Sequence, residues 1–355
     1  MTRPSSARKL LLPLVPAYRL ALWLRELRRG TELEPVRRLR FPVVSIGNLS
    51  TGGAGKTPLT IALAKALTQR SFQVDVLSRG YGRRSELPAC VNPRGDADEF
   101  GDEPLLIARE TGLPVYVARQ RYEAGLLAEA DLETDGGENH WPIVHLLDDG
   151  FQHRQLTRDV DILLLNRDDL PDSLLPAGNL REPLLALQRA TVLAIPADEP
   201  EVEQYLGEVV LIDRNSETSR WIGPVWRLHR KMEVPAVDGP VVAFCGIARP
   251  EQFFAGLESA GMHLAARMAF PDHHRFTVQD VESLLANARD VGAAALLTTE
   301  KDLVRLGKLA SNFSEALPVK AVGLRIEIED ENQAIEWLGA RIDDRLKLAP
   351  AHKPL

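Results

Sequence analysis

The sequence has few of the features that mark disulfide-stapled or membrane-spanning proteins. Its 355 residues include two cysteines, Cys90 and Cys245, which excludes a disulfide framework and a four-cysteine zinc site. The longest uncharged run near the N-terminus is the nine residues Leu10–Tyr18, whereas a membrane-spanning helix needs roughly 20 apolar residues. No cleavage site of small residues follows that run, so we expect neither a membrane span nor a signal peptide.

The charge is distributed unevenly along the chain. The first 40 residues hold ten Arg or Lys and three Glu, a net charge of +7, while the whole chain carries −7 and the remainder therefore −14. An acidic body argues against nucleic-acid binding and indicates one electrostatically specialised end. In that end Leu20, Trp23, Leu24 and Leu27 recur at helical spacing. Such a helix either packs on the protein's own core or rests on an anionic membrane surface.

The rest of the chain alternates short apolar runs with helical patterns, which is typical of an α/β fold. We predict a P-loop NTPase-like, mostly parallel sheet with helices on both faces, and a smaller C-terminal α/β domain. The predicted strands are 41–46, 72–77, 114–118, 142–147, 161–166, 190–195, 241–245, 263–270, 293–298 and 319–326. The predicted division is an amphipathic N-terminal segment over 1–40, a P-loop domain over 41–197, a connector with a small hairpin over 198–238 and the C-terminal domain over 239–345.

The strongest chemical signal is a glycine-rich loop between a predicted strand and a predicted helix, with the sequence Ser-Thr-Gly-Gly-Ala-Gly-Lys-Thr. Small residues allow successive backbone N–H groups to converge on phosphate oxygens, a Lys reaches the terminal phosphates, and a Thr hydroxyl binds Mg²⁺. The strict P-loop pattern has Gly where this chain has Ser50. The residues predicted to bind the nucleotide are Ser50, Thr51, Gly52, Gly53, Ala54, Gly55, Lys56 and Thr57.

Other carboxylates lie where such a sheet would use them. An apolar strand ends in Asp148 and Asp149, the position from which P-loop proteins approach Mg²⁺. Asp102 opens a predicted helix, so from the local pattern it is either an N-cap or a functional carboxylate. The Asp-His-His segment at 272–274 has no third ligand at zinc spacing and is more typical of a structural or acid–base pair.

These motifs resemble, in their order along the chain, those of the tetraacyldisaccharide 4′-kinases, the lipid A 4′-kinases of Gram-negative bacteria. Each motif alone is unspecific, but the ordered set covers nearly the whole chain. The P-loop of that family also lacks the first glycine, which accounts for Ser50, and the N-terminal helix resembles the family's membrane-facing helix. The segments that carry the resemblance are 45–58, 78–82, 101–104, 148–153, 175–183, 270–274 and 298–302.

The resemblance implies transfer of the γ-phosphoryl group of ATP to the 4′-hydroxyl of a lipid A disaccharide precursor. It also implies a peripheral enzyme on the cytoplasmic face of the bacterial inner membrane, contacting its anionic surface. The family motifs assign the catalytic base to Asp102, its partner to His273, and the phosphate-binding lysine to Lys56. Phosphoryl transfer also needs charge neutralisation, which we expect from Lys56, Mg²⁺ and Arg181. Because Asp102 and His273 are 171 residues apart, their pairing would place the site in a cleft between two domains.

The same resemblance supplies the remaining expected ligands. Mg²⁺ is expected on Thr57, Asp148 and Glu182. The residues expected to face the lipid headgroup are Asn48, Arg79, Tyr81, Arg121, Asp149, Gln152 and His153. A nucleic-acid partner is not expected, and the sequence indicates no protein partner.

Two other functional classes are compatible with a P-loop. One is an ATPase or GTPase switch of the type that often carries a Lys before the two loop glycines, where this chain has Thr51. The other is a membrane-associated nucleotide-binding assembly factor without catalysis. Only the kinase would produce a phosphorylated lipid.

Overall fold

The computed structural model describes residues 8, 10–29, 31, 35–53, 55–134, 141–208, 211–212, 218–219, 223–314 and 317–348. Its strands are β1 (Val43–Asn48), β2 (Gln73–Ser78), β3 (Ala89–Cys90), β4 (Val115–Val117), β5 (Ile143–Asp148), β6 (Val160–Leu164), β7 (Val192–Pro196), β8 (Leu211–Ile212), β9 (Thr218–Ser219), β10 (Val225–Glu233), β11 (Val241–Cys245), β12 (Leu264–Ala269), β13 (Ala295–Thr299) and β14 (Val319–Ile328). Its α-helices are α2 (Val15–Arg28), α3 (Lys56–Gln69), α4 (Ala97–Phe100), α5 (Asp102–Thr111), α6 (Arg121–Thr134), α7 (Pro200–Glu208), α8 (Pro250–Ser259), α9 (Val278–Asp290), α10 (Glu300–Leu306) and α11 (Glu331–Leu348). Short 3-10 helices are η1 (Leu12–Leu14), η2 (Arg167–Asp169), η3 (Leu184–Arg189) and η4 (Gly307–Asn312).

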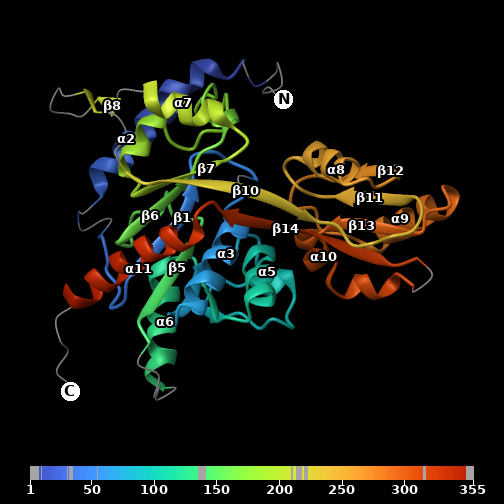
Figure 1. The fold of residues 1–355 in the computed structure, drawn as a ribbon, viewed down its shortest axis with the longest axis horizontal. Helices are drawn as coiled ribbons and strands as arrows, with labels where there is room; N and C mark the ends of the chain where they lie inside the picture. Colours follow the sequence, from blue (N-terminus) through green and yellow to red (C-terminus); the bar gives the residue numbers. More distant parts are fainter. Residues whose placement is uncertain are drawn as a thin grey trace.

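One twelve-stranded sheet runs through the described part of the molecule, in the order β12-β11-β13-β14-β10-β7-β6-β1-β5-β2-β4-β3 (Figure 1). Neighbouring strands are parallel except at two places, the β10–β14 pair and the edge strand β3 on β4. The first lobe comprises β1–β7 with their helices, and the second lobe comprises β11–β13 with α8–α10. The predicted α/β class with a mostly parallel sheet is confirmed.

Alternating side chains along the strands build a core on each face of the first lobe. In β1, Val44 and Ile46 join the core that holds α3, α5 and α11, whereas Val43 points to the face covered by α6. In β7, Val192 faces the first of these cores and Leu193 faces the opposite side, where η3 and α7 pack. Because successive strand residues point to opposite faces, apolar runs such as these require cover on both sides.

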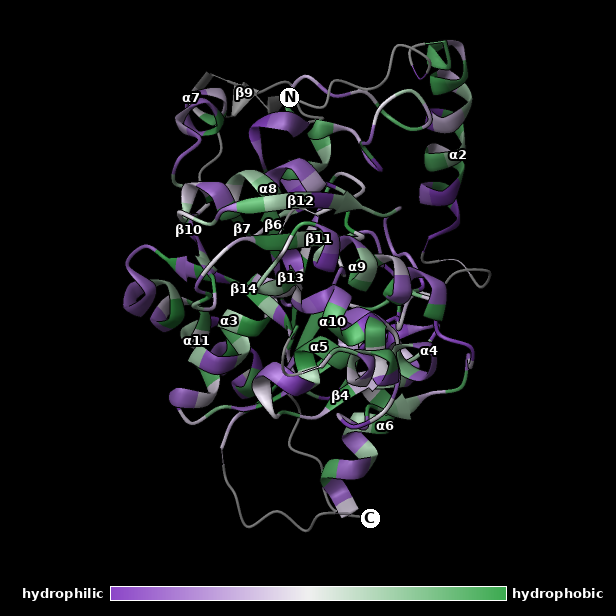
Figure 2. Ribbon diagram, turned by 90° about the vertical axis from the view of Figure 1, so that its right-hand side faces the viewer, coloured by the Kyte–Doolittle hydropathy of each residue, from purple (hydrophilic) through white to green (hydrophobic). Residues whose placement is uncertain are grey.

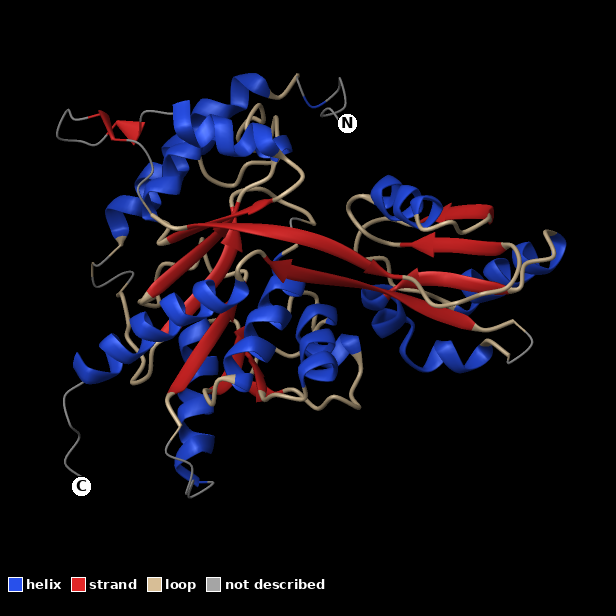
Figure 3. Cartoon of the chain, viewed as in Figure 1, coloured by secondary structure: helices blue, strands red, loops and turns tan. Residues whose placement is uncertain are grey.

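Two long strands join the lobes. The first part of β10 pairs with β7 and its second part with β14, while the first part of β14 pairs with β13. In Figure 3 these two strands cross together from the first lobe to the second. In the second lobe, α8 packs on one face of β11 and α9 on the other. The hydrogen-bonded sheet is therefore continuous between the lobes.

Two elements differ from the sequence prediction. Residues 198–238, expected as a connector with a small hairpin, do contain a short antiparallel pair, β8–β9, but they also contain α7 and the nine-residue strand β10. Alternating charges hide β10 in the sequence, because Arg227 and Lys231 point to solvent while Trp226 and Leu228 are buried. The last helix, expected with the C-terminal domain, instead packs in the first lobe, where Trp337 lies edge-on to Trp226 with ring centroids 6.2 Å apart.

Helix α2 lies at the periphery of the molecule (Figure 2). None of its side chains is fully buried, and Val15 and Tyr18 make its partly buried contact with the first lobe. The apolar residues predicted to form one face are exposed, with Trp23 and Leu27 each 56% accessible. The helix therefore does not use that face to pack on the protein's own core. Among the described residues, no helix has the length and apolar character that crossing a membrane requires.

Candidate active site

The glycine-rich loop joins the end of β1 to the start of α3, as predicted for a P-loop. Gly55 precedes α3 with a φ of 93°, a backbone conformation that favours glycine. Lys56 then begins the helix, and its ammonium donates a hydrogen bond to Asn48 Oδ1 at 3.0 Å. The Asn48 amide nitrogen in turn donates to Ser50 Oγ at 3.1 Å. Ala54 lies outside the described residues.

Three residues of the loop, Thr51, Gly52 and Gly53, have different surroundings. The backbone N–H of Thr51 donates to Asn179 O at 2.8 Å, which ties the loop to the predicted 175–183 motif. Gly52 has a φ of 100°, and a Cβ there would lie 3.4 Å from the Ala248 side chain of the second lobe. Nothing approaches within 4 Å of a Cβ built on Gly53. The P-loop is thus bordered by the second lobe at Gly52 and is open at Gly53.

Asp149 is held by two cationic side chains. Arg181 donates to both of its carboxylate oxygens, at 2.9 and 3.0 Å, and Lys56 Nζ lies 3.7 Å from Oδ1. Burial alone would raise the pKa of Asp149, but the charges of Lys56 and Arg181 hold it well below its usual range. Arg181 also donates to Asn48 Oδ1 at 2.6 Å. These side chains form one charged network at the ends of β1 and β5.

Asp148 is buried at the end of β5, close to the P-loop helix. Its Oδ1 accepts a hydrogen bond from Thr60 Oγ1 at 3.1 Å. Burial, together with the neighbouring charges of Glu103 and Asp149, raises the pKa of Asp148 to about 7. Thr57, whose hydroxyl is the other oxygen ligand predicted here, is also buried. Mg²⁺ prefers hard oxygen ligands such as carboxylates and hydroxyls, and these two side chains supply them.

The third predicted metal ligand, Glu182, has a different contact. Its carboxylate accepts a hydrogen bond from Arg189 at 2.6 Å. In the described part of the chain, no three His, Cys, Asp or Glu side chains are grouped to hold a metal ion. The contacts of Glu182 give its predicted metal role no support.

Asp102 meets His273 across the two lobes. Asp102 is the first residue of α5, and His273 follows β12 with a φ of 57°, which is strained for a residue other than glycine. Their Oδ2 and Nδ1 atoms are 3.2 Å apart. The N-cap of α5 is Gly101, so the alternative that Asp102 acts as the N-cap is wrong. The two side chains therefore lie next to each other, as expected from the sequence.

A third residue, Arg305 of α10, binds the same carboxylate. Arg305 donates to Asp102 Oδ2 through Nε at 2.7 Å and also through Nη2, and the latter lies 3.2 Å from His273 Nδ1. Burial would raise the pKa of Asp102, but the hydrogen bond with His273 and the charge of Arg305 keep it well below its usual range. On the same helix, Lys301 pairs with Glu103. The sequence pattern assigned no role to Arg305, Lys301 or Glu103.

The residues expected at the lipid headgroup lie beside this network and carry a surplus of positive charge. Gln152 Nε2 donates to Asn48 O at 2.8 Å, and buried Arg121 makes a long 3.5 Å contact with Asp149 O. Burial, then the charges of Arg121 and other arginines, lower the pKa of His153 to about 3. Arg79 and Tyr81 are exposed, and the Tyr81 ring lies edge-on to His273 at 5.5 Å.

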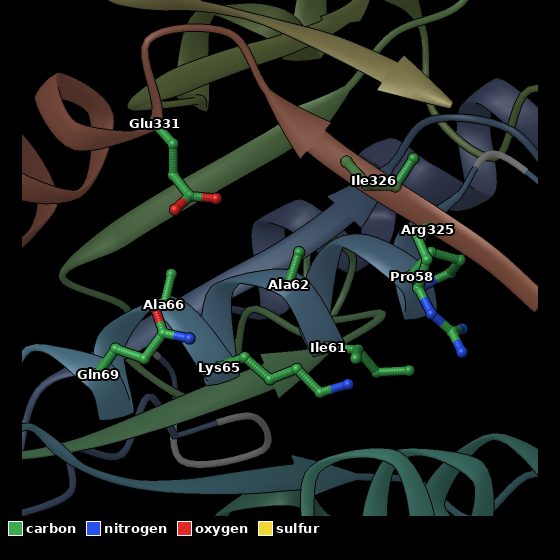
Figure 4. A pocket seen from close by; sticks show the side chains of 9 residues that line it. All are labelled: Pro58, Ile61, Ala62, Lys65, Ala66, Gln69, Arg325, Ile326 and Glu331. Carbon is green, nitrogen blue, oxygen red and sulfur yellow. The ribbon is translucent and has the colours of Figure 1, made fainter. Parts of the chain in front are cut away.

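A separate small pocket, of about 190 Å³, lies between α3, β14 and the start of α11. Figure 4 shows its nine lining side chains, which include Lys65 on α3 and Arg325 on β14. None of the predicted site residues lines it. The candidate active site is therefore distinct from this pocket.

The chain is similar to known proteins of one family. The family model for tetraacyldisaccharide-1-P 4′-kinase matches residues 7–343. A tetraacyldisaccharide 4′-kinase of Koribacter versatilis is 41% identical over 319 residues, 87% of this chain and 91% of the relative. One from Rhodopseudomonas palustris strain HaA2 is 36% identical over 92% of this chain and 91% of its own. The crystal structure of the "apo" form of LpxK from Aquifex aeolicus in complex with ATP is similar with a TM-score of 0.71 at 32% identity, covering 95% of this chain and 99% of that one.

Proposed function

The chain belongs to the tetraacyldisaccharide 4′-kinase family, and on that premise we propose how its residues perform the transfer. It is an ATP-dependent kinase of lipid A biosynthesis, which phosphorylates the 4′-hydroxyl of the tetraacyldisaccharide 1-phosphate precursor. The assignment of residues to steps rests mainly on the contact between Asp102 and His273, which joins the two lobes beside the P-loop.

Lys56 neutralises the phosphates of ATP, and residues 50–57 bind them. Phosphoryl transfer demands mainly positioning and charge neutralisation, because the protein makes no covalent bond to the transferred group. The Lys56 ammonium donates a hydrogen bond to Asn48 Oδ1 and lies near Asp149. These contacts hold it beside the P-loop rather than free in solvent. Arg181 binds both Asn48 and Asp149, and so fixes the two groups that hold the Lys56 ammonium.

Thr57 and Asp148 would hold Mg²⁺, which supplies neutralisation of the charge on the β- and γ-phosphates. Their oxygen donors fit this ion. Burial raises the pKa of Asp148 most, and the neighbouring charges of Glu103 and Asp149 raise it further; a divalent cation would offset that negative charge. Thr60 orients the Asp148 carboxylate by its hydrogen bond at 3.1 Å. Glu182 is the weaker candidate, because Arg189 already engages its carboxylate.

Asp102 accepts the proton of the 4′-hydroxyl as that oxygen bonds to the γ-phosphorus. A sugar hydroxyl is a poor nucleophile, so a positioned carboxylate base accelerates the attack. His273 comes from the second lobe, and its Nδ1 contacts the carboxylate. The base is therefore complete only when the two lobes are in contact.

Arg79 and Arg121, with His153 neutral beside them, form a cationic region that would take the anionic 1-phosphate end of the substrate. Arg121 is buried, and burial lowers its pKa to about 10 although the charge of Asp149 favours its cationic form. Buried cationic groups that repel one another are stabilised when an anion binds among them. Gln152 and Tyr81 border this region and suit contact with the sugar.

Helix α2 docks the enzyme on the cytoplasmic leaflet of the inner membrane. It combines exposed apolar side chains, among them Leu20, Trp23 and Leu27, with arginines at other positions of the helix. Tyr18 on its inner side donates a hydrogen bond to Arg181 O at 2.9 Å, which ties the helix to the loop that carries Arg181. A lipid acceptor embedded in a leaflet requires such an arrangement.

The test of this assignment is a direct phosphorylation assay. Purified protein is incubated with ATP, Mg²⁺ and the disaccharide lipid, and mass spectrometry measures the product that is heavier by one phosphate. Asp102→Asn should lower kcat by ~10²–10⁴-fold with little change in KM, because proton transfer matters in the transition state. If Asp102→Asn retains the wild-type kcat, Asp102 is not the base.

A further inference from the structure

The Thr-Thr-Glu-Lys-Asp motif at 298–302 has no role in the function described so far, although it opens α10 directly against α5. Its side chains are committed to different partners. Glu300 pairs with Arg325, Lys301 pairs with Glu103, and Asp302 accepts hydrogen bonds from Thr299 Oγ1 and from the backbone N–H of Gly246. One helical turn after Lys301, Arg305 faces Asp102. The helix thus places two cations on two adjacent carboxylates of the first lobe.

Arg305 is fixed from several sides. Its side chain is 6% exposed. Its Nη1 donates to Asp302 Oδ1 at 2.9 Å and to Gly246 O at 2.5 Å, and its Nε and Nη2 reach Asp102. Gly246 O also accepts a hydrogen bond from the backbone N–H of His273 at 3.2 Å, so one carbonyl binds both Arg305 and the backbone of His273. The planar guanidinium fork is suited to such multiple fixed contacts in a way that an ammonium is not.

The two oxygens of the Asp102 carboxylate have different surroundings. Oδ2 accepts from Arg305 twice and contacts His273 Nδ1. Oδ1 accepts one hydrogen bond, from the backbone N–H of Glu103 at 2.9 Å. A carboxylate oxygen has two lone-pair sites, so Oδ1 keeps capacity that Oδ2 has used.

We propose that Arg305 is a positioning residue for the phosphoryl transfer, which binds Asp102 Oδ2 and thereby leaves Oδ1 as the atom that takes the proton. The proposal rests on the assignment of Asp102 as the base. In the step, the 4′-hydroxyl gives its proton to Oδ1, the 4′-oxygen bonds to the γ-phosphorus, and the bond from that phosphorus to the bridging oxygen breaks to release ADP. Arg305 touches none of these reacting atoms and acts through the carboxylate.

The experiment compares Arg305→Gln and Arg305→Lys with a matched control, Arg267→Gln. Arg267 lies in the same lobe and pairs with Glu258 on the surface, away from the site. Arg305→Gln should lower kcat by ~10²-fold with nearly unchanged KM for ATP and lipid, because a misplaced base costs rate rather than binding. Arg305→Lys keeps the charge without the fork and should recover part of kcat. Arg267→Gln should match the wild type.

A pH profile separates positioning from a purely structural ion pair. The charged and titratable groups around the carboxylate are Glu103 on α5, Lys301, Asp302 and Arg305 on α10, and Asp272 and His273 after β12. The Arg305 charge favours the ionised form of Asp102, so removing it should move the acid limb of kcat/KM to higher pH. Arg305→Lys should leave that limb at its wild-type position.

A double mutant decides whether Arg305 acts through Asp102. The Asp102→Asn, Arg305→Gln protein should be no slower than Asp102→Asn alone, because residues that act as one unit are not additive. Losses that multiply would overturn the proposal, as would an Arg305→Gln enzyme with a lower thermal midpoint but the wild-type kcat and pH profile. If the Asp102→Asn single mutant keeps the wild-type kcat, Asp102 is not the base, and the positioning role of Arg305 fails with that assignment. If Asp102→Asn lowers kcat but Arg305→Gln does not, Asp102 remains the base and Arg305 does not position it.

Discussion

Replacing His145 with Gln should change how the stability of the first lobe depends on pH. His145 is completely buried on β5, with Nδ1 2.8 and 2.9 Å from the two carboxylate oxygens of Asp75 and Nε2 3.5 Å from Glu129. Burial alone would lower its pKa, but the hydrogen bonds and charges of Asp75 and Glu129 outweigh burial and raise the pKa to about 9. The imidazole is therefore a buried cation between two carboxylates at neutral pH.

The size of the effect follows from the shift. A rise from 6.5 to about 9 corresponds to roughly 3 kcal/mol of additional stability for the folded state. Because the folded pKa is raised, this contribution is complete below about pH 6.5 and disappears as the pH rises through about 9. The free energy of unfolding of the wild type, relative to His145→Gln, should fall by about 3 kcal/mol between pH 6 and pH 10.

Urea unfolding followed by tryptophan fluorescence at several pH values measures this difference. His229→Gln is the matched control, because His229 lies on the sheet at an exposed position and has one distant carboxylate, Glu329, at 3.9 Å. Its pH profile should follow that of the wild type. Wild-type and His145→Gln curves that run parallel from pH 6 to pH 10 would refute the reasoning.

Three further predictions concern the proposed chemistry and membrane contact. Lys56→Ala should lower kcat by at least ~10²-fold with a much smaller effect on the thermal midpoint, since the lysine at the start of α3 neutralises phosphate charge rather than packing in the core; steady-state kinetics and a melting curve measure both, and a mutant with most of the wild-type kcat would contradict the P-loop assignment. Phosphorylation should stop in excess EDTA and return when Mg²⁺ is added, and activity that persists in EDTA would contradict the metal requirement. Replacing Arg25, Arg28 and Arg29 with Glu should weaken co-sedimentation with anionic vesicles by at least ~10²-fold, at about 1 kcal/mol per lost charge, and Trp23→Ala should weaken it further; unchanged binding in both proteins would leave α2 without a membrane role.

The P-loop and most strands could be predicted from the sequence, because each depends on a local pattern. A glycine loop between an apolar strand and a helix, such as that before Lys56, indicates phosphate binding from a few neighbouring residues alone. Strand β10 could not be predicted in this way, since its alternating charges look like a solvated connector until the partner strand β14 is known. Its outward charges belong to an antiparallel pair that no short window of sequence contains.

The candidate site was predictable to a smaller extent. The pairing of Asp102 with His273 came from the family resemblance, because residues 171 positions apart carry no local signal of contact. Arg305 could not be found for the same reason, although the motif just before it is one of those that carry the resemblance. A single arginine on a helix is usually a surface residue, and only the approach of α10 to α5 makes it a partner of the carboxylate.

The return of the last helix to the first lobe has a consequence for how the chain matures on the ribosome. Helix α11 supplies Ile335, Leu338 and Ile342 to the core that covers α3, yet these residues are synthesised after the entire second lobe. The first lobe therefore emerges from the exit tunnel first and completes its core last, while the second lobe can fold in between. During that interval the part of α3 that packs against α11 and β14 is uncovered, and such transiently exposed apolar surface favours aggregation.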